Sequence, residues 1–168
     1  SGAPIMIGTI LNTMGAEAGK AYLQKLKAQN IAKSTASNRQ ILDLTIAGEY
    51  PLSLHIFNHH AYISKTAGAP VDWQPHEPVT ATIQTIALAK STPHPHAAML
   101  LLDFVMSEKG QKVFQQSNYL PSHPKVPAKQ PDLKPGGGRF KQAYYINPDV
   151  QYDKGNEWVE YFNNVFMK

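Results

Sequence analysis

The feature that most restricts the fold is a segment that is apolar on every side of a helix. Residues 95–106 read PHAAMLLLDFVM, and their Ala, Met, Leu, Phe and Val side chains would point all around a helix. A helix of this kind is stable in water only when other elements cover it. The sequence therefore predicts a buried helix, and it predicts more covering layers than a chain of 168 residues comfortably offers.

Composition excludes several classes of protein. Apolar residues make up 42% of the chain, which predicts a globular domain, and no apolar run approaches the roughly 20 residues that cross a bilayer. The net charge is only +4 and the Lys and Arg residues form no run, which argues against a nucleic-acid partner. The absence of cysteine excludes disulfide frameworks, zinc knuckles and thiol nucleophiles.

Helical periodicity and end signals predict most of the other elements. Helices are expected at 5–14, 16–29, 38–47, 58–66 and 108–117, with an amphipathic helix around Trp158 and Phe166 at the C-terminus. Ser37, followed three residues later by Gln40, forms a capping-box signature for the helix at 38–47. Ser107 is placed to cap the helix at 108–117.

Strand-like segments alternate with these helices. Residues 52–57 have the period of a strand whose two faces are both fairly apolar, and 70–74, 79–88 and 143–146 read as further strands. The alternation predicts an α/β fold with a sheet covered on both faces. A stretch rich in Pro and Gly, from 119 to 138, is predicted to be a long surface connection.

A series of motifs in a fixed order resembles bacterial extracellular solute-binding proteins. Residues 86–98 read IALAKSTPHPHAA and 104–111 read FVMSEKGQ. In that family a strand ends in Ala-x-x-Lys, a turn containing Pro and Ala opens a buried helix, and Ser-x-x-Gly-Gln begins the next helix. Further matches are AGEY at 47–50, AGAPV at 67–71 and LPSH at 120–123. The chain is most similar to the ferric-iron-type binding proteins of ABC importers, whose second lobe also carries a Ser-Gly-Ala turn, here residues 1–3.

The resemblance implies a type II periplasmic-binding-protein fold, in which two α/β lobes clamp a ligand. The chain would be the C-terminal half of such a protein. Residues 1–90 would form the ligand-binding domain of the second lobe, incomplete at its N-terminus, and 91–168 would be helical elements that return toward the first lobe and a C-terminal helix.

The resemblance also implies a role in transport. The protein would be the substrate-binding component of an ABC transporter and would perform no catalysis. Its partners would be a small-molecule or metal-ion ligand, an ABC permease in the membrane, and the missing N-terminal half of the same protein. We expect a periplasmic location with an export signal outside this chain, and no resident cofactor beyond a metal ion or an anion bound as ligand.

The predicted ligand site centres on two adjacent histidines. In the iron-type relatives two adjacent tyrosines at the end of a strand bind the metal, and alignment of residues 54–62 puts His59 and His60 at these positions. Imidazole suits Zn, Cu, Ni and Fe(II) better than Fe(III) in an all-oxygen shell, so iron specificity does not carry over. We expect His59 and His60 to contact the ligand or to coordinate a metal, Asn58 to add a polar contact, and Tyr62 to offer a phenolate.

Ser1, Gly2 and Glu77 are further candidates for polar contacts. Ser1 and Gly2 precede the first helix, and N–H groups at a helix start bind anions, as this turn does in the family. The ligand is then either a metal ion with an accompanying anion or an anionic organic solute. Glu77, in a break bounded by prolines, is either a contact where strands cross between lobes or a solvated carboxylate.

Two other functions stay open on the sequence alone. A metal-dependent hydrolase would use His55, His59 and His60 with Asp72 or Glu77, although no His-Glu-x-x-His or Gly-x-Ser-x-Gly motif is present. The effector-binding domain of a transcription regulator shares the two-lobed architecture and would stay in the cytoplasm.

Overall fold

The computed structural model describes residues 3–168, whose contacts divide the chain into two compact units. The first unit combines the residues up to Thr82 with Gln142–Lys168, and the second is Ile83–Lys141. No helix in this described range is long and apolar enough to cross a membrane. The predicted lobe boundary at residue 90 concerns the complete two-lobed protein and stays a prediction.

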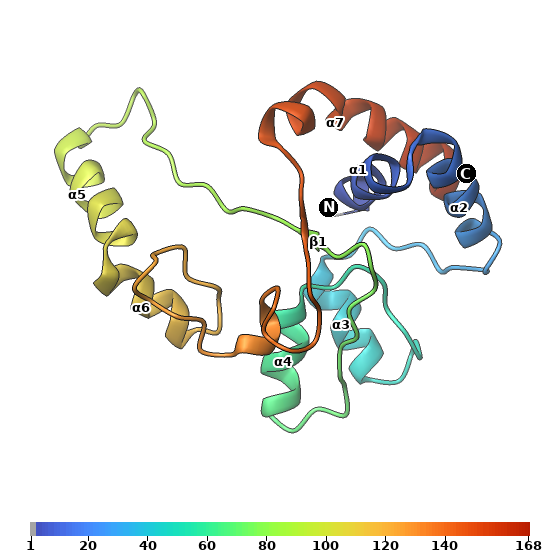
Figure 1. Cartoon of the computed structure of the whole chain (residues 1–168), viewed down its shortest axis with the longest axis horizontal. Helices are drawn as coiled ribbons and strands as arrows, with labels where there is room; N and C mark the ends of the chain where they lie inside the picture. The colour runs from blue at the N-terminus through green and yellow to red at the C-terminus, as the bar shows by residue number, and fades with distance from the viewer. Residues whose placement is uncertain (1–2) are drawn as a thin grey trace. The chain divides into compact units, whose positions relative to one another are not determined.

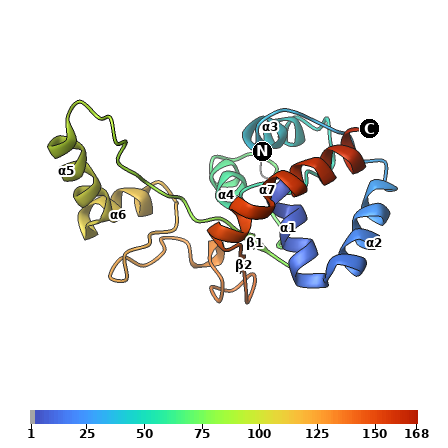
Figure 2. The ribbon, with the colours of Figure 1, turned by 90° about the horizontal axis from the view of Figure 1, so that it is seen from above.

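The core of the first unit is helical. It is formed by α1 (Ala3–Met14), α2 (Ala16–Lys27), α7 (Pro148–Phe162) and the π-helical turn η2 (Asn163–Met167). Helix α1 packs against both α2 and α7 (Figures 1 and 2). Buried apolar side chains of these elements, together with Ile146 just before α7, form one cluster: Ile7, Ile10, Leu23, Ile146, Trp158, Val165 and Phe166. The predicted helices at 5–14, 16–29 and the C-terminus are confirmed.

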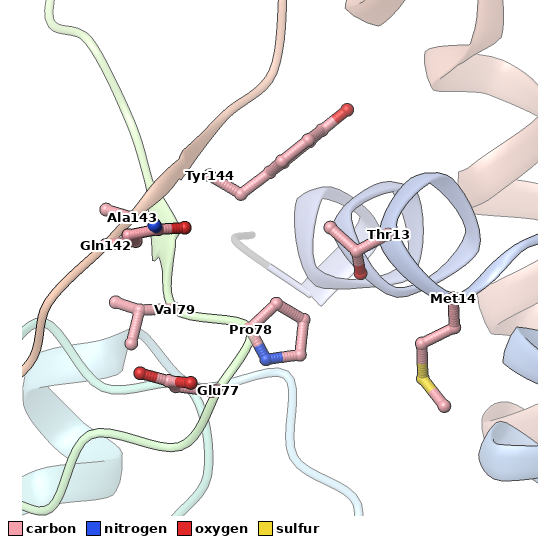
Figure 3. Close-up of a pocket in the computed structure, with 8 residues that line it drawn as sticks. All are labelled: Thr13, Met14, Glu77, Pro78, Val79, Gln142, Ala143 and Tyr144. Carbon is pink, nitrogen blue, oxygen red and sulfur yellow. The ribbon is translucent and has the colours of Figure 1, made fainter.

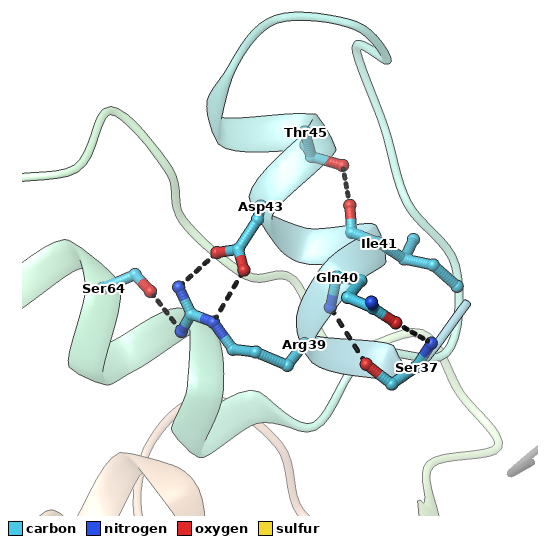
Figure 4. Close-up of polar contacts among 7 residues, drawn as sticks. All are labelled: Ser37, Arg39, Gln40, Ile41, Asp43, Thr45 and Ser64. Carbon is cyan, nitrogen blue, oxygen red and sulfur yellow. Dashed lines mark hydrogen bonds and ion pairs between the residues drawn. The ribbon is translucent and has the colours of Figure 1, made fainter.

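A second helix pair belongs to the same unit. Helices α3 (Asn38–Ile46) and α4 (Asn58–Thr66) contact each other. The capping box predicted for α3 is present: Ser37 Oγ accepts a hydrogen bond from Gln40 N at 3.3 Å, and Gln40 Oε1 accepts one from Ser37 N at 2.9 Å (Figure 4). Gly48 follows α3 with a φ of 84°, a conformation that favours glycine and ends the helix there.

The predicted sheet is largely wrong. Within residues 3–168 the only strands are β1 (Thr80–Ala81) and β2 (Tyr144–Tyr145), which pair in parallel with Thr80 opposite Tyr144. The strands expected at 52–57 and 70–74 are irregular instead. A strand needs a neighbour that satisfies its backbone groups and a layer that covers its apolar face. Leu52 is 72% exposed, so the described chain supplies no such cover there.

The second unit contains two consecutive helices and a long connection. Helices α5 (Pro95–Met106) and α6 (Glu108–Gln116) lie where the sequence predicts them, and Ser107 Oγ caps α6 by accepting a hydrogen bond from Gly110 N at 3.2 Å. The connection after α6 contains only the short 3-10 helix η1 (Pro131–Leu133) before β2. The prediction of a long connection at 119–138 is thus confirmed, although Val126 and Leu133 within it are buried.

The predicted burial of α5 is not found. No side chain of this helix is buried in the described chain, and Leu100 and Leu101 are 71% and 58% exposed. Met99, Phe104 and Met106 are exposed as well. Besides α5, the second unit contains only α6, the short η1 and irregular segments, and one helix cannot cover another on all sides. The second unit by itself therefore does not supply the covering layers that this sequence requires.

Candidate functional site

The two predicted ligand histidines lie in the first turn of α4. This helix begins at Asn58, its N-cap is Phe57, and no side chain caps it. The expectation that His59 and His60 follow a strand is wrong, because residues 52–57 form none. Asn58 is the first residue of α4 and directly precedes His59.

The histidines form an aromatic cluster with Phe57. The ring centroids of His59 and His60 are 4.4 Å apart, with ring planes at 65°. The Phe57 ring lies 5.7 Å from His59, nearly stacked, and 5.6 Å from His60, edge to face. Both histidines are half-buried. These contacts fix the two imidazoles beside each other and remove part of their surface from water.

Helix α3 lies against the His60 side of α4. His60 and Ser64 are one turn apart and share a face of α4. Arg39 Nη1 on α3 donates a hydrogen bond to the buried Ser64 Oγ at 2.8 Å, and the same guanidinium forms an ion pair with Asp43 (Figure 4). Arg39 therefore connects the two helices next to His60.

The surroundings keep both imidazoles uncharged at neutral pH. Burial, with a smaller contribution from His60, lowers the pKa of His59 from 6.5 to about 4. Burial lowers the pKa of His60 as well, and the Arg39 charge adds to that effect while Asp43 opposes it. His60 Nδ1 is buried and has no hydrogen-bond partner within residues 3–168. A neutral imidazole has one nitrogen that can accept a hydrogen bond or bind a metal.

The lowered pKa of His59 predicts that acid destabilises the first unit. Unfolded His59 takes up its proton near pH 6.5 and folded His59 only near pH 4. Between these values the unfolded state binds more protons, so the free energy of unfolding should fall as the pH drops from 6.5 toward 4. Trp73 and Trp158 both lie in the first unit, so tryptophan fluorescence during urea unfolding reports on it.

The control for this prediction is His59→Gln, which keeps a polar side chain and cannot titrate. The comparison uses the range from about pH 6.5 to 5, above the range in which most carboxylates titrate. We expect the urea midpoint of the variant to change less over that range than the midpoint of the unchanged chain. Equal slopes in the two proteins would show that His59 titrates normally in the folded state.

The other predicted site residues are only partly brought together. Tyr62 is half-buried on α4, three residues after His59 and therefore on a neighbouring part of the helix surface. His55, expected inside a strand, has a left-handed φ of 59°, and its carbonyl accepts a hydrogen bond from Asn38 Nδ2 at 3.4 Å. Ser1 and Gly2 lie outside the described residues.

The acidic groups proposed for a hydrolase do not join the histidines. Asp72 forms an ion pair with Lys65 at 2.6 Å, and Glu77 lines a pocket that neither histidine lines. Among residues 3–168, no group of three or more His, Cys, Asp or Glu side chains is arranged to hold a metal ion. His59 and His60 thus supply two nitrogen ligands at most, and no other His, Cys, Asp or Glu side chain of the described residues joins them.

Sequence reasoning missed two features of the first unit. The first is the hydrogen bond from Arg39 on α3 to Ser64 on α4. The spacing of four residues between Arg39 and Asp43 indicates their ion pair, but no sequence signal connects Arg39 to Ser64. The second is a pocket of about 420 Å³ between the end of α1 and the segments around β1 and β2 (Figure 3). Its residues are far apart in the sequence, so only the fold brings them together.

One comparison with known proteins gives a match. Residues 6–120 match the family model of the bacterial extracellular solute-binding proteins. The matched range includes the aromatic cluster on α4 and the Ser107-x-x-Gly110-Gln111 motif that joins α5 to α6. No curated protein and no solved structure is significantly similar to the chain.

Proposed function

The chain belongs to the family of bacterial extracellular solute-binding proteins, and from this membership we propose that it is part of the substrate-binding component of an ABC importer. The match over residues 6–120, which is more than half of the chain, is the observation that carries the proposal. The mostly helical structure with two short strands is consistent with a fragment of this α/β family. We propose binding and release of a small solute, with no catalytic step.

The complete protein would have the type II two-lobed fold and would act in the periplasm. In this proposal the chain is the C-terminal half, with residues 1–90 in the second lobe and 91–168 returning toward the first. The exposed apolar side chains of α5, such as Leu100 and Leu101, support a body larger than the described chain, because they require covering layers. The remaining partner is the membrane permease.

We propose that the solute contacts His59 and His60, and that it is a metal ion carried with an anion. Two neutral imidazoles are metal ligands, whereas an anion alone would gain no charge pairing from them. Because the described residues bring no third His, Cys, Asp or Glu side chain to the two histidines, the accompanying anion would complete the coordination. Asn58 and Tyr62 would add polar contacts, and Ser1 and Gly2 would contact the anion. Iron specificity is not part of this proposal.

Calorimetric titration of the chain tests this assignment. The probes are Zn(II), Zn(II) with citrate, Fe(III) with citrate, and citrate alone. We expect Zn(II) with citrate to bind most tightly, and we expect His59→Ala and His60→Ala each to weaken that binding at least about tenfold, as for loss of a metal ligand or its close support. His94→Ala, a histidine change in the second unit, is the matched control and should leave binding unchanged.

Two outcomes would overturn the metal assignment. Binding of citrate without metal would make the solute an organic anion and the histidines hydrogen-bond donors. Equal Zn(II) binding in the His59, His60 and His94 variants would place the metal elsewhere. Neither outcome would change the family membership, which rests on the match over residues 6–120.

A further inference from the structure

The pocket in the first unit lies away from the histidine cluster and shares no residue with it. It is lined by the last residues of α1, the segment before β1 and the segment that enters β2: Thr13, Met14, Glu77, Pro78, Val79, Gln142, Ala143 and Tyr144. Figure 3 shows Thr13 and Met14 on one side and Pro78, Val79 and Gln142 on the other. Its volume of about 420 Å³ lies within the range of small-molecule pockets.

The strand pairing holds these walls together. Tyr144 N donates a hydrogen bond to Val79 O at 2.7 Å, which fixes the segment before β1 beside the start of β2. Thr80 Oγ1 donates to Thr9 Oγ1 at 3.0 Å and so attaches β1 to α1. Thr9 is buried, so this contact anchors the strand to the helical core. The pocket is therefore built from three segments that are fixed to one another.

The charges around the pocket favour a cation. The C-terminal end of a helix carries partial negative charge on its last carbonyl groups, and α1 has no basic residue in its last turn that would offset it. The N-terminus of α2 follows at once, but Glu17 in its first turn balances the partial positive charge of that end. Glu77 adds a full negative charge to the pocket lining, and no ion pair within residues 3–168 involves it.

The uncharged lining residues indicate an organic cation and not a bare metal ion. Met14, Pro78, Val79 and Ala143 offer apolar surface, which suits the carbon atoms of a ligand. Thr13 Oγ1 donates to Thr9 O at 2.7 Å, so its oxygen presents lone pairs that accept hydrogen bonds. Gln142 adds a polar side chain to the lining. A carboxylate or phosphate ligand would be repelled there, because Glu77 and the carbonyl groups at the end of α1 carry negative charge.

We propose that this pocket is a binding site for a small organic cation, whose ammonium group lies near Glu77 and the C-terminal end of α1 and whose carbon atoms lie against Met14 and Val79. The site is separate from the solute site proposed at His59 and His60.

NMR titration with choline and with putrescine tests the proposal, with the Met14 methyl signal as the reporter. We expect a saturable shift of this signal with either cation. Glu77→Gln keeps the size of the side chain and removes its charge, and it should raise the dissociation constant about fivefold or more, the effect of losing about 1 kcal/mol. Glu49→Gln, which changes an exposed carboxylate outside the pocket, should leave the dissociation constant unchanged.

The remaining probes separate the outcomes. Acetate and glycerol should produce no saturable shift of Met14, and His59→Ala should bind choline as the unchanged chain does. The proposal is overturned if Glu77→Gln and Glu49→Gln bind the cations equally, if acetate or glycerol shifts Met14 as strongly as choline, or if no probe gives saturation. Loss of choline binding in His59→Ala would show that the two sites are one.

Discussion

Replacing Trp158 with alanine is expected to lower the free energy of unfolding of the first unit by about 3–5 kcal/mol, as for other large buried aromatic residues. Trp158 is 2% exposed and belongs to the cluster that joins α1, α2, α7 and η2. Its ring lies directly on α1, where a Cβ added at Gly8 would be 2.6 Å from two ring carbons. Gly8 itself has no side chain that could fill the space that the indole leaves.

Hydrogen exchange of the α1 amides measures this effect in the first unit alone. Exchange of these protected amides in Trp158→Ala should be faster by a factor that corresponds to the lost stability. Val159→Ala is the matched control, since Val159 is adjacent on α7 and 43% exposed, and it should cost less than about 1 kcal/mol. A loss below about 1 kcal/mol for Trp158→Ala would mean that α7 does not form the core with α1.

The helices could be predicted from the sequence because their signals are local. The Ser37–Gln40 capping box and the Ser107 cap each depend on residues within one turn, and both are formed. The same holds for the end of α3 at Gly48. Local hydrogen bonds of this kind need no distant partner, so a short window of sequence is sufficient to find them.

The strands and the burial of α5 could not be predicted. A strand depends on the segment that pairs with it, and the burial of a helix depends on the elements that pack over it. Residues 52–57 have the alternation of a strand, but no other segment of the described chain pairs with them. The apolar pattern of 95–106 correctly predicts a helix, yet it cannot show which residues cover it. Pairing and burial are tertiary properties, which the pattern of a short segment does not specify.

The candidate site shows the same division. That His59 and His60 are adjacent on one short helix follows from the pattern of 58–66, although the strand expected before them is absent. Their neutral state does not follow from the pattern, because it results from burial and from Arg39 on another helix. The pocket beside Glu77 joins residues more than 60 positions apart, which periodicity cannot detect.

The motif Ser107-x-x-Gly110-Gln111 has a structural explanation that leads to a second strong prediction. Gly110 is buried where α6 crosses the end of α5, and a Cβ added to it would be 2.1 Å from Phe104 O and 2.9 Å from Val105 Cα. These are backbone atoms, so a methyl group can be accommodated only if α6 moves away from α5. Such a movement would also break the contacts of the neighbouring residue.

Gln111 makes those contacts. Its Nε2 donates a hydrogen bond to Val105 O at 2.9 Å, and its Oε1 accepts from Ser122 N at 2.7 Å and from Ser122 Oγ at 3.2 Å. The Gln111 side chain is 5% exposed, so groups left without a partner there would be costly. It thereby attaches the loop after α6 to the end of α5, and a shift of α6 would disrupt all three bonds.

We therefore expect Gly110→Ala to destabilise the second unit by about 3 kcal/mol, the upper part of the range for overpacking. Gly155→Ala is the matched control: Gly155 is also helical, but an added Cβ would have nothing within 4 Å. That change should stabilise α7 by about 0.5–1 kcal/mol, because alanine favours the helix over glycine. Hydrogen exchange of the Ser122 amide for the first variant and of the α7 amides for the second measures both effects. The same sign for the two substitutions would show that α6 does not approach α5 as closely as Gly110 requires.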